Sequence, residues 1–205
     1  TLIDYLLDAF GGPGAGFMYA ITAVLALAIA ITLDRTWVLM WKWRCDIESV
    51  LTLLDQGRLS EAKNATEQTP LGDVIRAGAA ESDADLAWES MSNASIRAEG
   101  RIRVRIPYLN TISNLSTMLG LLGTVYGLIV AFSGLGDTAA TQRAAGLSEG
   151  ISTAMATTAY GLLVGIPALA LHAWLESRVQ EQLECMESAA GRLALGLRRA
   201  SSKRP

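Results

Sequence analysis

Three stretches of the sequence lack acidic and basic side chains over lengths that cross a lipid bilayer. They are residues 17–33, a 31-residue stretch at 106–136, and a 26-residue stretch at 150–175 in which His172 is the only titratable side chain. A helix needs about 20 mostly apolar residues to cross roughly 30 Å of hydrocarbon. The first stretch also lacks the polar stripe of a soluble surface helix. The sequence therefore predicts three transmembrane helices rather than long buried helices of a soluble bundle.

The composition excludes several classes of function. Of the 205 residues, 51% are hydrophobic and 18% are charged, against about 25% charged in average chains. The 17 basic and 20 acidic residues give a net charge of −3, so no basic field favours nucleic acid. Cys45, Cys185 and His172 form no cluster in the sequence from which a metal site or a nucleophile could be built. We expect no enzymatic activity, no cofactor and no metal.

The basic residues predict the orientation of the chain. Ten lie at 34–107 and six at 175–205, whereas 133–150 has one and 1–16 has none. Because Lys and Arg accumulate in cytoplasmic loops, the N-terminus is expected in the periplasm and the C-terminus in the cytoplasm. The predicted segments are a periplasmic amphipathic helix and turn (1–16), TM1 (17–33), a cytoplasmic helical region (34–107), TM2 (108–132), a periplasmic loop (133–150), TM3 (151–175) and a cytoplasmic C-terminal helix and tail (176–205).

The parts outside the bilayer also carry helical patterns. Residues 1–10 place apolar side chains on one face and two aspartates on the other, as in a helix lying at a membrane interface. The first membrane helix is expected to continue into the cytoplasm, short helices are expected at 58–68 and 73–81, and 85–105 is expected to run straight into TM2. The fold class is all-α: an integral membrane protein with three transmembrane helices, long cytoplasmic helical extensions and a short N-terminal interfacial helix.

Small and hydroxylated residues recur along the second and third membrane helices. Glycines at helical spacing allow close helix packing, and hydroxyl groups in lipid need polar partners or must bond back to their own helix. None of the three spans contains Asp, Glu, Lys or Arg, so a proton conducted here needs a carboxylate from another chain. The predicted packing residues are Gly120, Gly123, Gly127, Gly161 and Gly165.

These helices resemble the second and third helices of the MotA/TolQ/ExbB proton-channel family. The resemblance rests on GLLGTVYGL at 120–128 and TTAYGLLVGIPAL at 157–169. Three spans are similar to the ExbB/TolQ type, while TTAYG resembles the motility-motor branch. The chain has Thr153 where ExbB and TolQ usually carry Glu. The resemblance implies that Thr124 and Thr158 line an ion pathway, and the predicted pathway also includes Thr157, Thr153 and Thr117.

The resemblance implies an ion-channel, stator-like subunit of a motor in the bacterial inner membrane. Five such subunits would surround a single-span dimer of the ExbD/TolR/MotB type, whose aspartate carries the ion, and membrane lipids would be the other partner. The motor would convert proton motive force into mechanical work on an envelope partner. Sodium stays open as the driving ion, because uncharged oxygen ligands suit a hard cation. The alternative function is a non-conducting membrane scaffold that assembles an envelope complex.

Overall fold

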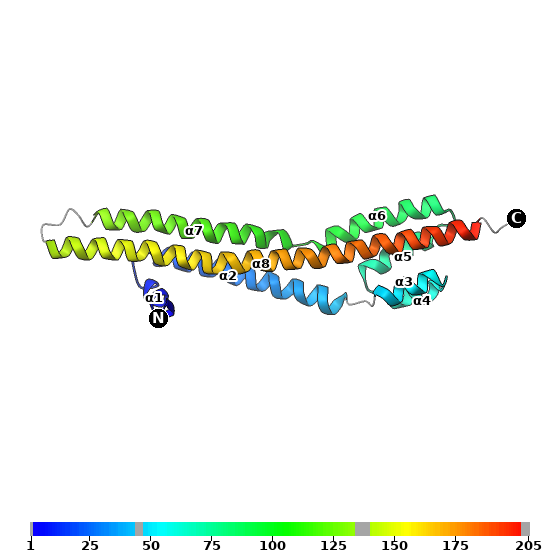
Figure 1. Cartoon of the computed structure of the whole chain (residues 1–205), viewed down its shortest axis with the longest axis horizontal. Helices are drawn as coiled ribbons and strands as arrows, with labels where there is room; N and C mark the ends of the chain where they lie inside the picture. Colours follow the sequence, from blue (N-terminus) through cyan, green and yellow to red (C-terminus); the bar gives the residue numbers. More distant parts are fainter. Residues whose placement is uncertain (1, 44–46, 134–139, 202–205) are drawn as a thin grey trace. The chain divides into compact units, whose positions relative to one another are not determined.

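The chain is all-α wherever its structure is described. The computed structural model describes residues 2–43, 47–133 and 140–201, and each element in these ranges is helical. In chain order (Figure 1) the elements are α1 (Leu2–Ala9), α2 (Ala15–Trp37), the π-helical turn η1 (Val38–Lys42), α3 (Ile47–Asp55), α4 (Leu59–Ala65), α5 (Pro70–Ala79), α6 (Ala84–Ile102), α7 (Ile106–Ser133) and α8 (Ala140–Ser201). This confirms the expected fold class.

The chain divides into two compact units. Unit 1 comprises Thr1–Leu33 and Ile106–Ala173, and unit 2 comprises Asp34–Arg105 and Trp174–Pro205. Unit 1 therefore holds α1, most of α2, α7 and the first part of α8. Unit 2 holds η1, the short helices α3 to α6 and the rest of α8.

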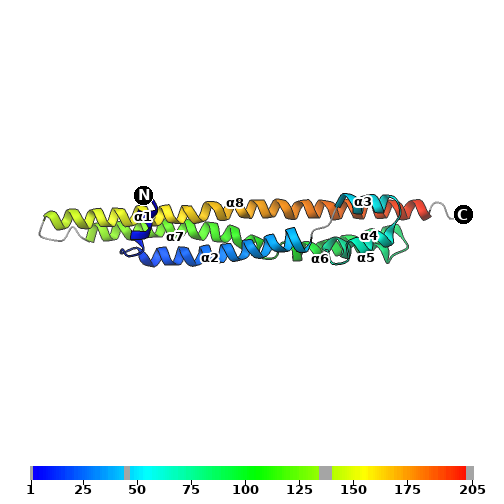
Figure 2. The ribbon, with the colours of Figure 1, turned by 90° about the horizontal axis from the view of Figure 1, so that it is seen from below.

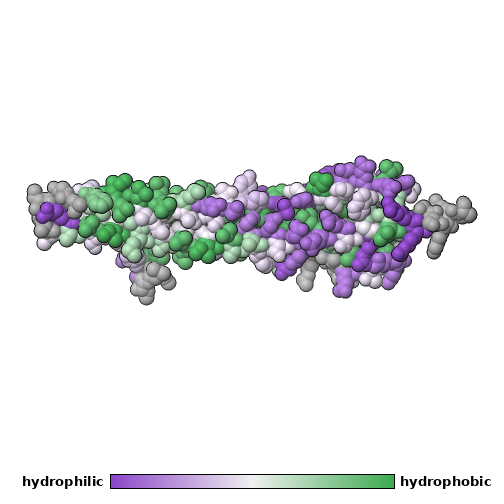
Figure 3. Space-filling model, turned by 45° about the horizontal axis from the view of Figure 1, so that its top comes forward, coloured by the Kyte–Doolittle hydropathy of each residue, from purple (hydrophilic) through white to green (hydrophobic). Residues whose placement is uncertain are grey.

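The helices of unit 1 are apolar on their outer as well as their inner faces. Met18 and Ile21 of α2 are fully buried, yet Leu33 of the same helix is 66% exposed. In α7, Leu109 is buried while Phe132 is exposed. Figure 3 shows the resulting hydrophobic surface over this part of the chain. Within the described ranges, three helical stretches are long and apolar enough to cross a membrane: Ala15–Trp41, Ala84–Ser133 and Thr141–Arg199.

Helix α1 is hydrogen-bonded to α8 within unit 1. The Tyr5 hydroxyl donates to the Ser152 carbonyl at 2.6 Å and lies 2.8 Å from the Ser152 hydroxyl. The Phe10 ring, just after α1, packs edge to face on Tyr19 and Tyr160, with centroids 5.4 and 5.6 Å away. The helix expected at 1–10 is therefore present, and aromatic contacts fix its end against the membrane helices.

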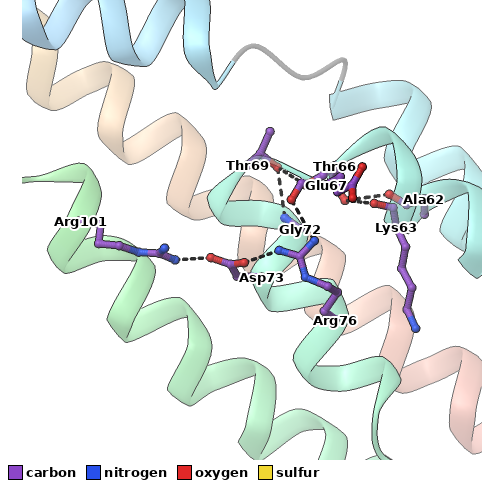
Figure 4. Close-up of polar contacts among 9 residues, drawn as sticks. All are labelled: Ala62, Lys63, Thr66, Glu67, Thr69, Gly72, Asp73, Arg76 and Arg101. Atoms are coloured by element: carbon purple, nitrogen blue, oxygen red, sulfur yellow. Dashed lines mark hydrogen bonds and ion pairs between the residues drawn. The ribbon is translucent and has the colours of Figure 1, made fainter.

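In unit 2, local sequence signals explain how α5 and α6 begin. Thr69 precedes α5, its hydroxyl accepts a hydrogen bond from the Gly72 amide at 3.2 Å, and Pro70 occupies the first turn (Figure 4). The Asp83 carboxylate accepts bonds from the first amides of α6. Thr and Asp caps satisfy amides that lack partners within a helix, and proline fits the first turn because it has no N–H to leave unpaired.

Unit 2 packs these helices as a bundle around the distal part of α8. Val74 and Ile75 of α5, with Met91 of α6, are almost completely buried. A Cβ added to Gly78 would collide with the Met91 side chain and would lie 3.0 Å from Leu193 of α8. The glycine therefore lets α5 approach both helices closely. The expected short helices at 58–68 and 73–81 correspond to α4 and α5.

The helix leading into the second membrane span is interrupted, which corrects the expectation that 85–105 runs straight into it. Helix α6 ends at Ile102 and α7 begins at Ile106, and Arg105 between them has a φ of +68°. Pro107 explains the break, because a proline ring clashes with the carbonyl four residues earlier, here Arg103, and lacks the amide that would bond to it. A left-handed φ is rare for residues other than glycine.

One other boundary differs from the expected one. Residues 140–150, expected within a periplasmic loop, are the first three turns of α8. They contain alanines and no proline, so nothing in their composition prevents a helix. The first membrane helix does continue beyond residue 33, as α2 to Trp37 and then as the π-helical turn η1, and α3 begins at Ile47. The remainder of the 133–150 prediction, at 134–139, and Cys45 lie outside the described residues.

Asp73 lies between two arginines in unit 2. Its carboxylate forms ion pairs with Arg76 in the same helix and with Arg101 of α6 (Figure 4). Burial by itself raises the pKa of the Asp73 carboxyl, but the hydrogen bonds from Arg101 and Arg76 outweigh burial and leave the pKa below its ordinary value of 3.8. The ion pairs join α5 to α6 while Asp73 is charged.

We expect Asp73→Asn to lower the stability of unit 2 at neutral pH but not in strong acid. Because the folded-state pKa is depressed, Asp73 contributes stability above its unfolded-state pKa, and this contribution disappears as pH falls through the folded-state value. The partly exposed partners limit the loss to about 1 kcal/mol. Thermal unfolding of the full chain in detergent at pH 7 and at pH 2 measures the difference. Glu61→Gln, which breaks the exposed Arg58–Glu61 pair, is the control; equal losses for Asp73→Asn at both pH values would contradict the assignment.

Candidate functional site

A close contact between α7 and α8 forms the centre of unit 1, and Figures 1 and 2 show the two helices side by side there. A Cβ on Gly127 would lie 2.6 Å from the Ala154 amide nitrogen and 2.7 Å from the Gly150 carbonyl oxygen. A Cβ on Gly161 would lie 2.6 Å from the Ser116 carbonyl oxygen. Real Cβ atoms do not approach backbone this closely, so only glycine permits the observed helix separation.

The other predicted packing glycines lie on the same contact. A Cβ on Gly120 would lie 3.2 Å from the Gly161 Cα, and one on Gly165 would lie 2.9 Å from the Thr117 hydroxyl. A Cβ on Gly123 would lie 2.5 Å from the Thr157 side chain. The glycine pattern in the sequence therefore marks the face that each helix turns toward the other.

Two threonines meet across this contact. The hydroxyl oxygens of Thr124 and Thr158 are 2.5 Å apart. Both also lie within hydrogen-bond distance of the Gly120 carbonyl oxygen, Thr158 at 3.1 Å and Thr124 at 3.3 Å. A threonine hydroxyl has one proton to donate and two lone pairs. Each hydroxyl can donate to the Gly120 carbonyl, and either can donate to the other hydroxyl, so both protons have acceptors within the chain and lone pairs remain free on the pair.

The threonine pair opens into an apolar groove on the outside of the two helices. The groove has a volume of about 520 Å³. Thr124 and Thr158 are among its lining residues, and both are half-buried. Its other lining residues are all apolar: Leu128, Ile151, Ala154, Met155, Ala159 and Leu162. The groove therefore offers hydrogen-bond acceptors in apolar surroundings and has no charged side chain of its own.

The other threonines predicted for the pathway lie elsewhere. Thr153 and Thr157 are buried, and a Cβ on Gly14 would collide with both of their methyl groups, at 2.6 and 3.2 Å. The Thr157 hydroxyl donates to the Thr153 carbonyl at 3.0 Å. Thr117 is exposed and donates to the Ser113 carbonyl at 3.1 Å. Within one chain the groove therefore brings together Thr124 and Thr158 alone of the five, and pathway roles for the others stay predictions.

Several polar contacts of unit 1 were not anticipated from the sequence. The Ser113 hydroxyl donates to the Gly165 carbonyl at 2.7 Å, and Thr22 and Tyr160 lie 2.9 Å apart through their hydroxyls. The His172 Nδ1 lies 3.2 Å from the Ile106 carbonyl oxygen. Ser113 and His172 stand seven residues from Gly120 and Gly165 respectively, so continuing the glycine spacing by two turns would have found both.

With this geometry in view, residues 66–188 match the MotA/TolQ/ExbB proton channel family. The chain belongs to this family. The matched residues include all of α7, with Thr124, and the part of α8 that carries Thr158. The family assignment made from the two glycine-rich motifs is therefore confirmed, together with a fold that has three helices long and apolar enough to span a membrane.

Curated family members are similar to parts of the chain. The ExbB-like 3 putative biopolymer transport protein of Synechocystis is 35% identical over 124 residues, which cover 60% of this chain and 57% of that protein. The Tol-Pal system protein TolQ of Pseudomonas aeruginosa is 36% identical over 93 residues, or 42% of this chain and 39% of TolQ. The matched region thus spans little more than half of the first relative and less of the second.

A solved structure shares the fold. The structure of C. jejuni MotAB contains a chain that superposes with a TM-score of 0.55 at 19% sequence identity, covering 93% of this chain and 80% of that one. At this identity the likeness concerns the helical architecture, which the family therefore keeps while most side chains change.

Proposed function

We propose that this protein is the ion-conducting subunit of a motor in the bacterial inner membrane, with its N-terminus in the periplasm. Five copies surround a dimer of single-span ExbD/TolR/MotB-like chains. Ion flow between the two kinds of subunit drives mechanical work on an envelope partner. The proposal is supported chiefly by the threonine pair in its apolar groove. The pair can accept a hydrogen bond from a group that carries a proton, but it cannot carry the proton itself.

The free lone pairs of Thr124 and Thr158 determine which chemical groups of a partner can bind in the groove. Both hydroxyl protons are committed within the chain, so the pair can accept a hydrogen bond but has none to give. A protonated carboxyl group of a partner helix supplies such a donor, whereas an ionised carboxylate would be repelled by the lone pairs and penalised by the apolar lining. The groove therefore favours the partner aspartate in its protonated form.

Release of the proton would then change the preferred position of the partner helix. A unit charge crossing the membrane releases about 2.3 kcal/mol per 100 mV, which biases two rotational positions by roughly 50-fold at that voltage. Alternate protonation and release of the aspartate can therefore move the inner helices past successive grooves of the ring. The chemistry is ion transfer, and the proposed function includes no enzymatic step.

Reconstitution tests the proposal. The chain is coexpressed with a neighbouring single-span membrane protein that carries an early Asp, purified, and placed in liposomes with a proton-sensitive dye inside. We expect the two chains to co-purify as a complex with five copies of this protein and to conduct protons when a potential is applied. Parallel measurement with a sodium-sensitive dye distinguishes the two driving ions. Assembly without conduction of either ion would favour the scaffold function instead.

A further inference from the structure

A line of polar groups continues from the threonine pair along the same face of α7. Thr124, Thr117 and Asn110 follow one another at intervals of seven residues, and Thr117 and Asn110 are exposed. Seven residues make almost two full helical turns and advance about 10.5 Å. The three side chains therefore share one stripe of α7, which extends about 21 Å from the groove toward the beginning of the helix.

Helix α8 carries a matching series at the same interval. Thr158 bonds to the Gly120 carbonyl, the Gly165 carbonyl accepts from Ser113, and His172 contacts the Ile106 carbonyl. Each of these residues is seven after the preceding one, so they form a ladder of polar contacts to α7. His172 is the last member, and it is the only histidine in the sequence.

The contact with Ile106 shows which ring nitrogen of His172 carries a hydrogen atom. A carbonyl oxygen only accepts hydrogen bonds, so His172 must donate through Nδ1–H at the observed 3.2 Å. A neutral imidazole that carries its proton on Nδ1 has a lone pair on Nε2. The ring is half-buried, and its orientation is held by the hydrogen bond. His172 therefore presents a proton acceptor at the end of the polar stripe.

We propose that His172 is the proton relay at the cytoplasmic end of the ion pathway. This inference rests on the proposed function, in which Ile106 and His172 lie near the cytoplasmic side. Nε2 takes the proton of a hydronium ion that arrives along the stripe, which leaves water and an imidazolium, and Nε2 then gives the proton to cytoplasmic water, which becomes hydronium. Nδ1 keeps its proton on the Ile106 carbonyl throughout, so the ring returns to its starting form.

The charged residues that follow His172 in the sequence, and those that precede α7, form ion pairs with one another within unit 2. Glu176 follows one turn later on α8, and Arg103 and Arg105 precede α7. Arg103 pairs with Glu176 at 3.0 Å and with Glu99 at 3.2 Å, and Arg105 pairs with Asp34 at 3.1 Å. Each of the two arginines is thus matched by a carboxylate. The relay also favours protons over sodium, because a hard cation prefers oxygen ligands to an imidazole nitrogen.

His172→Asn separates proton transfer from structure. The asparagine Nδ2 can occupy the position of Nδ1 and donate to the Ile106 carbonyl, but asparagine does not titrate. In the reconstituted complex we expect His172→Asn to co-purify with its partner in normal amount and to reduce proton flux by about a hundredfold. His172→Ala should lose the same flux and recover part of it when imidazole is added, because free imidazole supplies the missing acceptor.

The experiment distinguishes failure of the relay from failure of the proposed function. Normal flux through His172→Asn would overturn the relay, as would His172→Asn losing flux while His172→Ala shows no recovery with imidazole, since that pattern indicates a structural role. A wild-type complex that conducts sodium and not protons would also overturn it but would leave the motor function intact. A wild-type complex that conducts neither ion would overturn the proposed function together with the relay.

Discussion

Gly127→Val is expected to break the packing of α7 on α8 and to destabilise the protein by about 3 kcal/mol, the upper end of the usual range for an overfilled contact. A Cβ at this position would already lie 2.6 Å from one backbone atom of α8 and 2.7 Å from another. Backbone cannot rotate away as a side chain can, so the two helices would have to separate. The loss should appear as a lower unfolding temperature in detergent and as a smaller yield of assembled complex.

Gly191→Ala is the matched control, since it also changes a helical glycine. A Cβ added there has no neighbour within 4 Å, and alanine favours a helix over glycine by up to about 1 kcal/mol. We expect this variant to be as stable as the wild type or more stable. Equal stability of Gly127→Val and the wild type would show that the observed approach of α7 and α8 is wrong.

Thr158→Val is expected to reduce ion conduction at least tenfold while the complex still assembles. Valine has nearly the shape of threonine, so the helix contact is kept, but the hydroxyl that links Thr124 to the Gly120 carbonyl is lost. Thr124 would then donate to that carbonyl alone, at a present distance of 3.3 Å, and one of the two acceptor groups of the groove would disappear. We expect proton flux in liposomes to fall at least tenfold, which corresponds to a rise of about 1.4 kcal/mol or more in the barrier.

Two further variants identify the cause of such a loss. Thr158→Ser keeps the hydroxyl and should conserve most of the flux. Thr32→Val removes a hydroxyl that bonds only to the Ala28 carbonyl of its own helix, at 2.8 Å, and should conduct normally. Full flux through Thr158→Val, or an equal loss in Thr32→Val, would remove the threonine pair from the ion pathway.

The spans, the fold class and the helix contact could be predicted because each depends on a local or periodic property of the sequence. Missing charges identify the spans, and glycines at helical spacing identify the face on which α7 meets α8. The common role of Thr124 and Thr158 could be predicted only from resemblance to a family. The sequence of one helix does not identify the residue of the other helix that lies opposite.

The remaining features depend on geometry that sequence patterns do not contain. Thr153 and Thr157 are threonines like the pair in the groove, yet they lie on a different face of α8. Thr153 packs against Gly14, and Thr157 packs against both Gly14 and Gly123. Pro107 breaks the helix before Ile106 although good helix formers lie on both sides of it. Their pattern alone does not show whether the helix ends there. The bond from His172 to Ile106 requires the register between α7 and α8, which is fixed only when the glycine contacts are made.

The commitment of both threonine protons also determines which small molecules could block the groove. A ligand gains nothing by offering carboxylates or carbonyls, because the groove has no donor for them. Compounds that combine a compact aliphatic body with a neutral hydroxyl group match both the apolar walls and the free lone pairs. Such aliphatic alcohols would compete with the partner helix, whereas the corresponding ionised acids would serve as inactive analogues.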